Sequence, residues 1–276
     1  MNLRDEMRGK VEASLLGFIP KRFDVIGSVA VISIPEELRA FKKEIAETLA
    51  SKRKNVRTVL NKVSKLEGDH RVAGFELLLG NSTKTLHREN GYVYALDVES
   101  VFFNPRLYSE RERVTAGISP SENVLVPFAG VGPFVLPAAG RGAKVLALEI
   151  NPGACACLRE NIRLNRLEDR VSVIMGDAET LPWLLKGGKG PGSENSGFLF
   201  DRAIVPTPYG PDHFLGKVSQ CVKKGGYIHY YTFKPAEQLP PLVEEYENMG
   251  FEVSFYRRCG NVAPGISRWV FDLLKK

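Results

Sequence analysis

The feature that most constrains the fold is a pair of apolar segments that each end in turn-forming residues. Residues 124–128 (Val-Leu-Val-Pro-Phe) lead into Ala-Gly-Val-Gly at 129–132, after which a helical pattern begins. A second apolar run, residues 145–150, carries Glu149 near its end and is followed by Asn-Pro at 151–152. A strand, a glycine turn and an acid about 20 residues later are typical of a nucleoside-binding site in a doubly wound sheet.

The glycine turn departs from the dinucleotide-binding pattern at its third glycine. The pattern G-x-G-x-x-G would need glycine where Val135 stands, and a bulky residue there argues against a pyrophosphate on the turn. Glycines let the backbone approach a ligand, and Glu149 can accept hydrogen bonds from a ribose. The pattern therefore fits a ligand without phosphates, such as S-adenosylmethionine (AdoMet).

From about residue 116, strand-like and helix-like patterns alternate along the chain. We expect strands near residues 123–128, 144–149, 171–175, 199–205, 226–231, 251–256 and 267–273. We expect helices near residues 132–139, 152–165, 211–222 and 236–249. Such alternation predicts a mostly parallel sheet covered by helices on both faces, with the ligand beyond the carboxyl ends of the strands.

The first part of the chain has a different pattern. Residues 23–34 predict a strand broken at Gly27, and Pro35 opens a helix. Further strands are expected at 56–63 and 75–79, followed by a hairpin with strands at 83–87 and 92–98 across the turn Glu89-Asn90-Gly91. The predicted organisation is an extension at 1–22, a small α+β domain at 23–115 and a doubly wound domain at 116–276.

Composition narrows the class of protein without identifying it. The chain of 276 residues has 43% hydrophobic and 25% charged residues and a formal net charge of +6, which is ordinary for a soluble globular protein. Its four cysteines form no metal-ligand or disulfide pattern, so we expect no metal site, and free thiols suit a reducing cytoplasm. No apolar run reaches the length of a membrane span, so no membrane association is expected.

Positive charge is concentrated between residues 41 and 65. This basic stripe holds eight lysines and arginines against two glutamates, an excess equal to that of the whole chain. A concentrated stripe of this kind indicates a phosphate-backbone footprint, or alternatively a solvated helix face. The basic residues of the stripe are Lys42, Lys43, Lys52, Arg53, Lys54, Arg57, Lys62 and Lys65.

Several short motifs together resemble one enzyme family. They lie at residues 23–27, 58–63, 68–71, 87–91, 103–111, 128–134, 149–152, 228–231 and 261–264. Taken together they are similar to the archaeal and eukaryotic tRNA (guanine-37-N1)-methyltransferases and to their relatives, the wybutosine-pathway aminocarboxypropyl transferases. The resemblance implies a Rossmann-like class I AdoMet-dependent methyltransferase domain with a small N-terminal α+β RNA-binding domain, acting as a monomer on the anticodon region of tRNA.

The resemblance also implies roles for individual residues. Glu110 would be the general base that takes the N1 proton of guanine, and Arg71 would stabilise the negative charge that develops on O6. The residues expected to bind AdoMet are Phe128, Ala129, Gly130, Gly132, Glu149, Ile150, Asn151, Asp177, Ala178 and Pro206. Those expected to bind the substrate are Asn104, Arg106, Arg111, Thr207, Pro208 and Tyr209.

Three functions remain open at this point. The run Asn-Pro-Arg-Leu at 104–107 favours methyl transfer to guanosine N1 over aminocarboxypropyl transfer to the same nucleotide. Two positions depart from the family: Val126 stands where an acid is expected, and Pro206 replaces an asparagine. These departures motivate a third hypothesis, a tRNA-binding paralogue with weak catalysis.

Overall fold

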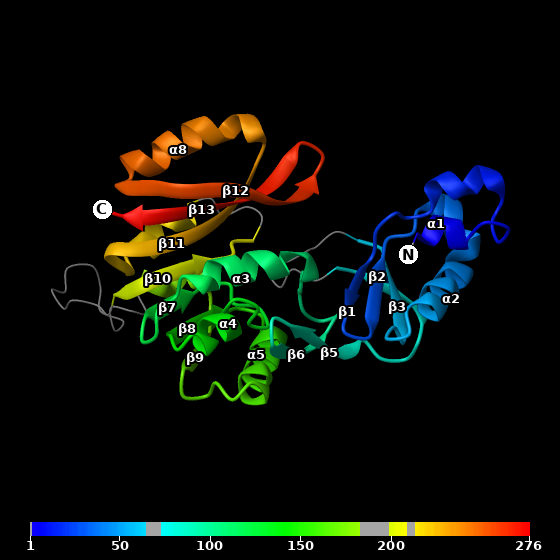
Figure 1. Cartoon of the computed structure of the whole chain (residues 1–276), viewed down its shortest axis with the longest axis horizontal. Coiled ribbons are helices and arrows are strands. Elements are labelled where there is room, and N and C mark those ends of the chain that lie inside the picture. The colour runs from blue at the N-terminus through cyan, green and yellow to red at the C-terminus, as the bar shows by residue number, and fades with distance from the viewer. Residues whose placement is uncertain (1, 65–72, 183–198, 209–212) are drawn as a thin grey trace. The chain divides into compact units, whose positions relative to one another are not determined.

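The computed structural model describes residues 2–64, 73–182, 199–208 and 213–276, which form two compact units, Met1–Arg106 and Leu107–Lys276 (Figure 1). Each unit has its own cluster of buried apolar side chains. No helix in the described ranges is both long enough and apolar enough to cross a membrane.

The second unit is built on one seven-stranded sheet in the order β12-β13-β11-β10-β7-β8-β9. β13 pairs antiparallel with both β11 and β12, and the remaining pairs are parallel. The strands are β7 (Asn123–Val126), β8 (Lys144–Glu149), β9 (Val171–Met175), β10 (Phe200–Val205), β11 (Val222–Lys234), β12 (Phe251–Ala263) and β13 (Ile266–Lys275). The α-helices are α3 (Tyr108–Ala116), α4 (Val135–Gly140), α5 (Pro152–Leu164), α7 (Phe214–Ser219) and α8 (Leu239–Asn248). The predicted doubly wound fold is confirmed.

The strand order reverses at β7. From β7 the chain continues through β8 to β9 on one side, whereas β10 and β11 lie on the other side of β7. In open α/β sheets a crevice forms where the order reverses, outside the carboxyl ends of the strands. The segments that leave these ends, residues 127–132 after β7 and 206–208 after β10, therefore border the expected ligand crevice.

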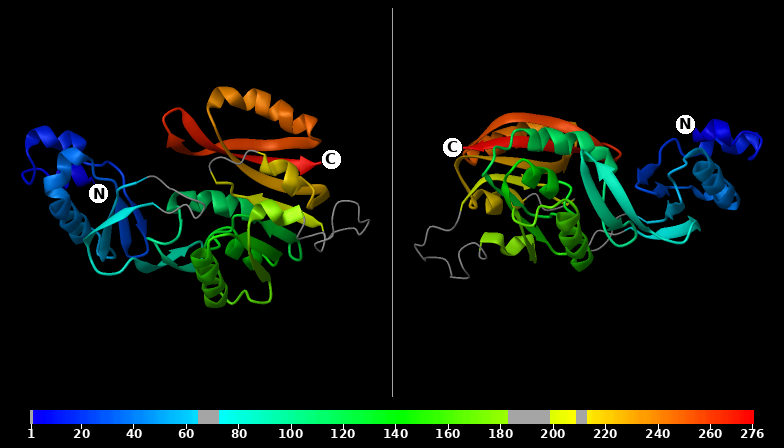
Figure 2. Two further views of the ribbon diagram at one scale, coloured as in Figure 1. Left: turned by 180° about the vertical axis from the view of Figure 1, so that it is seen from behind. Right: turned by 60° about the horizontal axis from the view of Figure 1, so that its bottom comes forward.

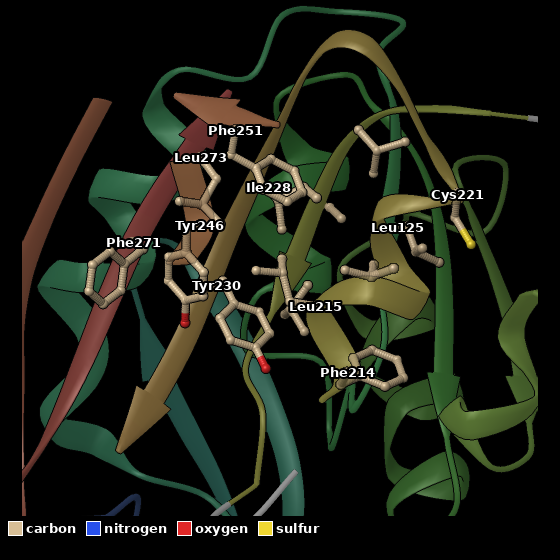
Figure 3. Close-up of a cluster of buried hydrophobic side chains, with 14 of the residues drawn as sticks. Leu125, Phe214, Leu215, Cys221, Ile228, Tyr230, Tyr246, Phe251, Phe271 and Leu273 are labelled. Carbon is tan, nitrogen blue, oxygen red and sulfur yellow. The ribbon is translucent and has the colours of Figure 1, made fainter. Parts of the chain in front are cut away.

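Both faces of the sheet are covered, and neighbouring residues of β11 show how. Tyr230 is fully buried in an apolar cluster with side chains of α7 and α8, including Phe214 and Tyr246 (Figure 3). Tyr231 is the next residue along the strand, and successive side chains of a strand point to opposite faces. Its hydroxyl reaches Glu110 of α3, so α3 lies on the other face. In Figure 2, α8 lies beside β12 and α5 beside β9.

Three strands are longer than the sequence pattern predicted. The expected strand at 251–256 extends to Ala263, and the one at 226–231 spans Val222–Lys234. Most side chains after Phe255 in β12 are exposed or half-buried, so this segment lacks the alternation by which a strand is recognised. It pairs with β13 through three register shifts instead, and backbone hydrogen bonds across the hairpin extend the strands.

The first unit contains a four-stranded sheet in the order β1-β2-β3-β4 and a separate hairpin of β5 and β6. Only β2 and β3 are parallel. Its strands are β1 (Asp24–Ile26), β2 (Val29–Ile32), β3 (Thr58–Lys62), β4 (Phe75–Leu79), β5 (Lys84–Glu89) and β6 (Tyr92–Asp97). Its α-helices are α1 (Leu3–Glu6) and α2 (Lys42–Lys52), joined by 3-10 turns at Ala13–Phe18, Glu36–Phe41 and Pro105–Leu107, the last of which reaches the unit boundary. The predicted break at Gly27 and the turn at Asn90-Gly91 are both present.

The boundaries of the units differ from the expected ones. Residues 1–22 are no appendage, because Leu3, Met7 and Ile19 are buried in the core that also contains β2 and α2. The division falls after Arg106 rather than after residue 115. Helix α3 belongs to the second unit because its Glu110 bonds to the sheet.

The Gly27–Ser28 turn, where β1 meets β2, predicts a sharp effect on stability. A Cβ on Gly27 would overlap the Thr85 hydroxyl and the Leu86 carbonyl of β5, and Gly27 has φ +57°. The Gly27→Ala variant should melt well below the wild type. The matched control is Gly91→Ala, which has φ +84° with open space around it and should cost only about 1 kcal/mol of strain. Thermal melts followed by circular dichroism test this, and equal melting temperatures for the two variants would contradict it.

Candidate functional site

The segment after β7 has an unusual backbone that brings it close to β8. Phe128, Gly130 and Gly132 all have positive φ, at 57°, 56° and 96°. Positive φ is strained for an aromatic residue, and the Phe128 ring packs edge-on against Phe214 at 4.9 Å. Between them, the Ala129 N–H donates to the Leu148 carbonyl of β8 (2.9 Å). The turn is therefore fixed at the edge of the sheet.

Glu149 ties the two strand ends together. One carboxylate oxygen accepts the N–H of Gly130 at 2.7 Å, and the other accepts the N–H of Asn151 at 2.8 Å. A carboxylate has about four acceptor positions, so each oxygen keeps capacity for a further donor. The acid predicted to bind a ribose is thus placed at the crevice and oriented by backbone amides.

Asparagines stabilise the helix that follows. The Asn151 side chain caps α5 by accepting the N–H groups of Gly153 and Ala154, as Asn-Pro predicted. Asn161 of α5 is fully buried and donates to the Val131 carbonyl at 2.9 Å. Gly132 also packs closely here, since a Cβ would lie 2.5 Å from Leu158. The glycine turn and α5 are locked together.

The other predicted cofactor residues lie at neighbouring strand ends. Asp177 follows β9, is exposed and accepts the N–H of Glu179 (2.9 Å), while Ala178 is buried. Pro206 is half-buried after β10, and Ile150 is 39% exposed after β8. Ligand-facing positions are therefore available at four successive strand ends. Val126, the first departure, is completely buried, and such a position accepts an apolar side chain.

The substrate residues predicted after β10 are partly fixed by the sheet. The Thr207 hydroxyl donates to the Tyr231 carbonyl of β11, and Thr207 is buried. Pro208 is half-buried. Tyr209 lies outside the described residues, as does the proposed catalytic Arg71.

The Glu110 carboxylate is surrounded by protein donors. It receives the Arg113 guanidinium (2.8 Å), the Arg257 guanidinium (Nε, 2.8 Å) and the Tyr231 hydroxyl (3.2 Å). Its side chain is 2% exposed, whereas that of Arg257 is 40% exposed. Burial and the neighbouring Glu110 carboxylate raise the pKa of Tyr231, so the phenol stays a donor. Glu110 therefore joins α3 to β11 and β12.

Arg113 continues this contact into a chain of buried charges. Its guanidinium also binds the Asp272 carboxylate in a forked pair, at 2.6 and 3.1 Å. Asp272 contacts His229 Nδ1 at 2.6 Å, and His229 Nε2 contacts Arg202 at 2.8 Å. Arg202 then pairs with Glu122 at 2.9 Å. Buried charges are tolerated when each is paired in this way.

The donors and acceptors of the chain determine the state of His229. An arginine can only donate, so Nε2 accepts from Arg202 and the ring proton sits on Nδ1, which donates to Asp272. Burial lowers the pKa of His229 despite the opposing effect of Asp272, which keeps the ring neutral. Burial alone would raise the pKa of Asp272, but hydrogen bonds from His229 and Arg113 lower it to about 2.

The predicted substrate residues near the unit boundary have different environments. Arg106 makes a forked pair with Asp24 at 2.6 and 3.0 Å, within the first unit. Asn104 accepts the Arg106 N–H at 3.0 Å. Arg111 is 1% exposed in the second unit, so it is a core residue in this structure.

Sequence reasoning missed most members of the buried chain. Arg113, Arg257 and Asp272 stand in stretches that read as exposed charge, because their partners are 3, 147 and 159 residues away. His229 stands out in the sequence only as part of a family motif. The one usable signal is a histidine and an aspartate inside otherwise apolar strands at 226–231 and 267–273, since buried polar groups require partners.

Comparisons with known proteins agree with this architecture. Residues 85–249 match the TRM5/TYW2 methyltransferase domain, and residues 3–83 match the TYW2 N-terminal domain. The tRNA (guanine(37)-N(1))-methyltransferase Trm5b of Pyrococcus abyssi is 40% identical over 82% of this chain and 64% of its own length. The tRNA(Phe) (4-demethylwyosine(37)-C(7)) aminocarboxypropyltransferase of Pyrococcus horikoshii is 33% identical over 98% of this chain and 95% of its own length.

Solved structures of the same group superpose over nearly all of the chain. The complex of aTrm5 with tRNALeu has a TM-score of 0.85 at 31% identity, covering 100% of this chain and 78% of that protein. TYW2 of P. horikoshii in complex with MeSAdo has a TM-score of 0.75 at 32% identity, covering 98% and 97%. The chain spans less than two thirds of the length of the Trm5b relatives that it matches, 64% and 60%.

The buried chain predicts how stability depends on pH. The folded-state pKa of Asp272 lies near 2, below its usual value of about 3.9. Its stabilising effect should therefore be complete above pH 4 and disappear as the pH falls toward 2. The Asp272→Asn variant should be less stable at pH 7, and its deficit should shrink by about 2 kcal/mol in acid.

Urea unfolding midpoints of wild type and variant, measured between about pH 2 and pH 7, test this prediction. Glu252→Gln, at an exposed residue of β12, is the matched control and should follow the wild type throughout. A deficit of Asp272→Asn that stays constant with pH would contradict the assignment.

Proposed function

The chain belongs to the TRM5/TYW2 methyltransferase family, and we propose that it is an AdoMet-dependent transferase that modifies nucleotide 37 of tRNA. The family resemblance found in the sequence is thereby confirmed. The observation that carries the proposal is the Glu149 carboxylate, held between the amides of Gly130 and Asn151 at the strand-order reversal.

The residues at the crevice fit AdoMet by their chemistry. Glu149 retains acceptor capacity for ribose hydroxyls, and Asp177 offers an exposed carboxylate for an adenine amino group. The turn lacks the third glycine of a pyrophosphate site, and the TYW2 relative was solved with MeSAdo. When bound, AdoMet supplies an activated carbon on a sulfonium, and the remaining cofactor contacts are proposed for the residues named above at the strand ends.

For the group transferred, we favour methylation of guanosine N1. Trm5b of P. abyssi shares 40% identity with this chain, and the Asn-Pro-Arg-Leu run at 104–107 supports the same branch. Glu110 would then take the N1 proton, and Arg71 would stabilise charge on O6. Arg257 is the more exposed of the two arginines on Glu110, so it is the partner that the base would displace.

Aminocarboxypropyl transfer is the second candidate, and specific observations favour it. The first unit matches the TYW2 N-terminal domain over residues 3–83. The aminocarboxypropyltransferase of P. horikoshii aligns with this chain from end to end, covering 95% of its own length. In this case the substrate would already carry a modified base at position 37.

The first prediction from this proposal concerns the product. Unmodified tRNA transcripts with guanosine at position 37 should gain a methyl group when incubated with the protein and AdoMet, and transcripts with adenosine there should not. Mass spectrometry of the nucleosides measures this. An aminocarboxypropyl adduct, on this tRNA or on one carrying 4-demethylwyosine, would assign the second candidate. Binding of tRNA without any product would indicate the non-catalytic paralogue.

The second prediction concerns Glu110. The Glu110→Gln variant keeps the side-chain shape but cannot take a proton, so turnover should fall by about 10²- to 10⁴-fold while AdoMet affinity stays near the wild-type value. Asp272→Asn is the matched control, because it removes the other carboxylate on Arg113. It should lower the melting temperature without a comparable loss of turnover in the folded enzyme. Equal losses of turnover in both variants would leave Glu110 with a structural role.

A further inference from the structure

The first unit contains a basic cavity that none of the roles above uses. Its volume is about 630 Å³, within the range of small-molecule and nucleotide sites. The residues that matter here are Lys21, Arg22, Phe23, Arg53, Asn55 and Arg106. They come from three separate stretches: the approach to β1, the segment after α2 and the end of the unit. The fold therefore brings four cations together from distant parts of the chain.

Charge in this cavity is poorly compensated. Arg106 is paired with Asp24 through both arms of its guanidinium. Lys21, Arg22 and Arg53 have no ion pair within the part of the chain that the structure describes. Lys21 and Arg22 are exposed, so they remain hydrated. Like charges gathered around a concave surface attract an anion.

The cavity is also partly ordered before any ligand arrives. The Arg53 guanidinium lies over the Phe23 ring, 5.9 Å from its centroid, which limits the positions of its donors. The Asn55 amide donates to the Gly27 carbonyl at 3.1 Å, fixing the segment after α2 against the β1–β2 turn. The Asp24 pair restrains Arg106 in the same way. A guanidinium held in place loses less entropy when it binds a phosphate.

The rest of the basic stripe is largely neutralised. On α2, Lys42 pairs with Glu76 at 2.7 Å, and Lys43 lies 4.0 Å from Glu47. Lys52 pairs with Glu6 at 2.7 Å. The helix face that the charge pattern indicated as a phosphate footprint therefore carries mostly paired charge. Arg53, the next residue after α2, is where the stripe meets the cavity.

We propose that this cavity binds backbone phosphates of an RNA strand. The proposal rests on the function proposed above, since the RNA in question is the tRNA substrate. Guanidinium groups bind phosphates through paired hydrogen bonds, and phosphate contacts position a nucleic acid without reading its sequence. The cavity thus contributes to affinity for tRNA in general rather than to recognition of the modified base.

The test is tRNA binding by the full chain, measured by filter binding at several salt concentrations. Arg22→Glu and Arg53→Glu should each weaken binding at least about tenfold at about 0.1 M salt. Each should also reduce the slope of log K against log salt by about 0.7 to 0.9 for every phosphate that the variant no longer neutralises. Lys43→Glu makes the same charge change on an exposed residue of α2 and should leave both quantities nearly unchanged.

Further arms separate the alternatives. Arg53→Lys keeps the charge and should retain the salt slope while losing part of the affinity. Melting temperatures confirm that each variant is folded. If wild type binds tRNA and the cavity variants bind equally well, the cavity proposal is overturned and the proposed function stands. If wild type does not bind tRNA, the proposed function itself fails. Tight binding of inorganic phosphate alone, with unchanged tRNA affinity in the variants, would make the cavity a small-anion site instead.

Discussion

The fold of the second unit depends on a chain of buried charges that cannot be left unpaired. It runs from Glu110 through Arg113, Asp272 and His229 to Arg202 and Glu122. Removing one member of a buried pair typically costs about 3–5 kcal/mol, because its partner is left without compensation. Each member therefore requires the next, and together they fix α3 on the face of the sheet opposite α7 and α8. This chain also sets the environment of the proposed base.

The proposed cofactor site depends on a different device, the backbone of the turn after β7. Three residues with positive φ and the Glu149 carboxylate hold this turn against β8. Rigid backbone donors and acceptors suit a ligand that must be aligned rather than chemically activated by the protein. The strained Phe128 is offset by its contact with Phe214 in the core, so the apolar cluster supports the site directly.

Electrostatics divides the two units by purpose. In the second unit the buried arginines Arg113 and Arg202 are paired with carboxylates, and their charge is used to build structure. In the first unit Arg22 and Arg53 line an open cavity without such partners among the described residues. A surface cation without a partner contributes little to stability but remains able to attract a phosphate.

The sequence by itself determined the doubly wound sheet, the glycine turn with Glu149, and the family, because strand periodicity and turn chemistry are local. It also placed the hairpin at Asn90-Gly91. Only the tertiary structure decided that α3 belongs to the second unit, that Glu110 is shared by Arg113, Arg257 and Tyr231, and that Lys42 and Lys52 are neutralised while Arg53 faces a cavity. The physical reason is sequence distance: ion pairs between residues up to 159 positions apart leave no local pattern. A charged side chain reads as solvated until its partner is seen.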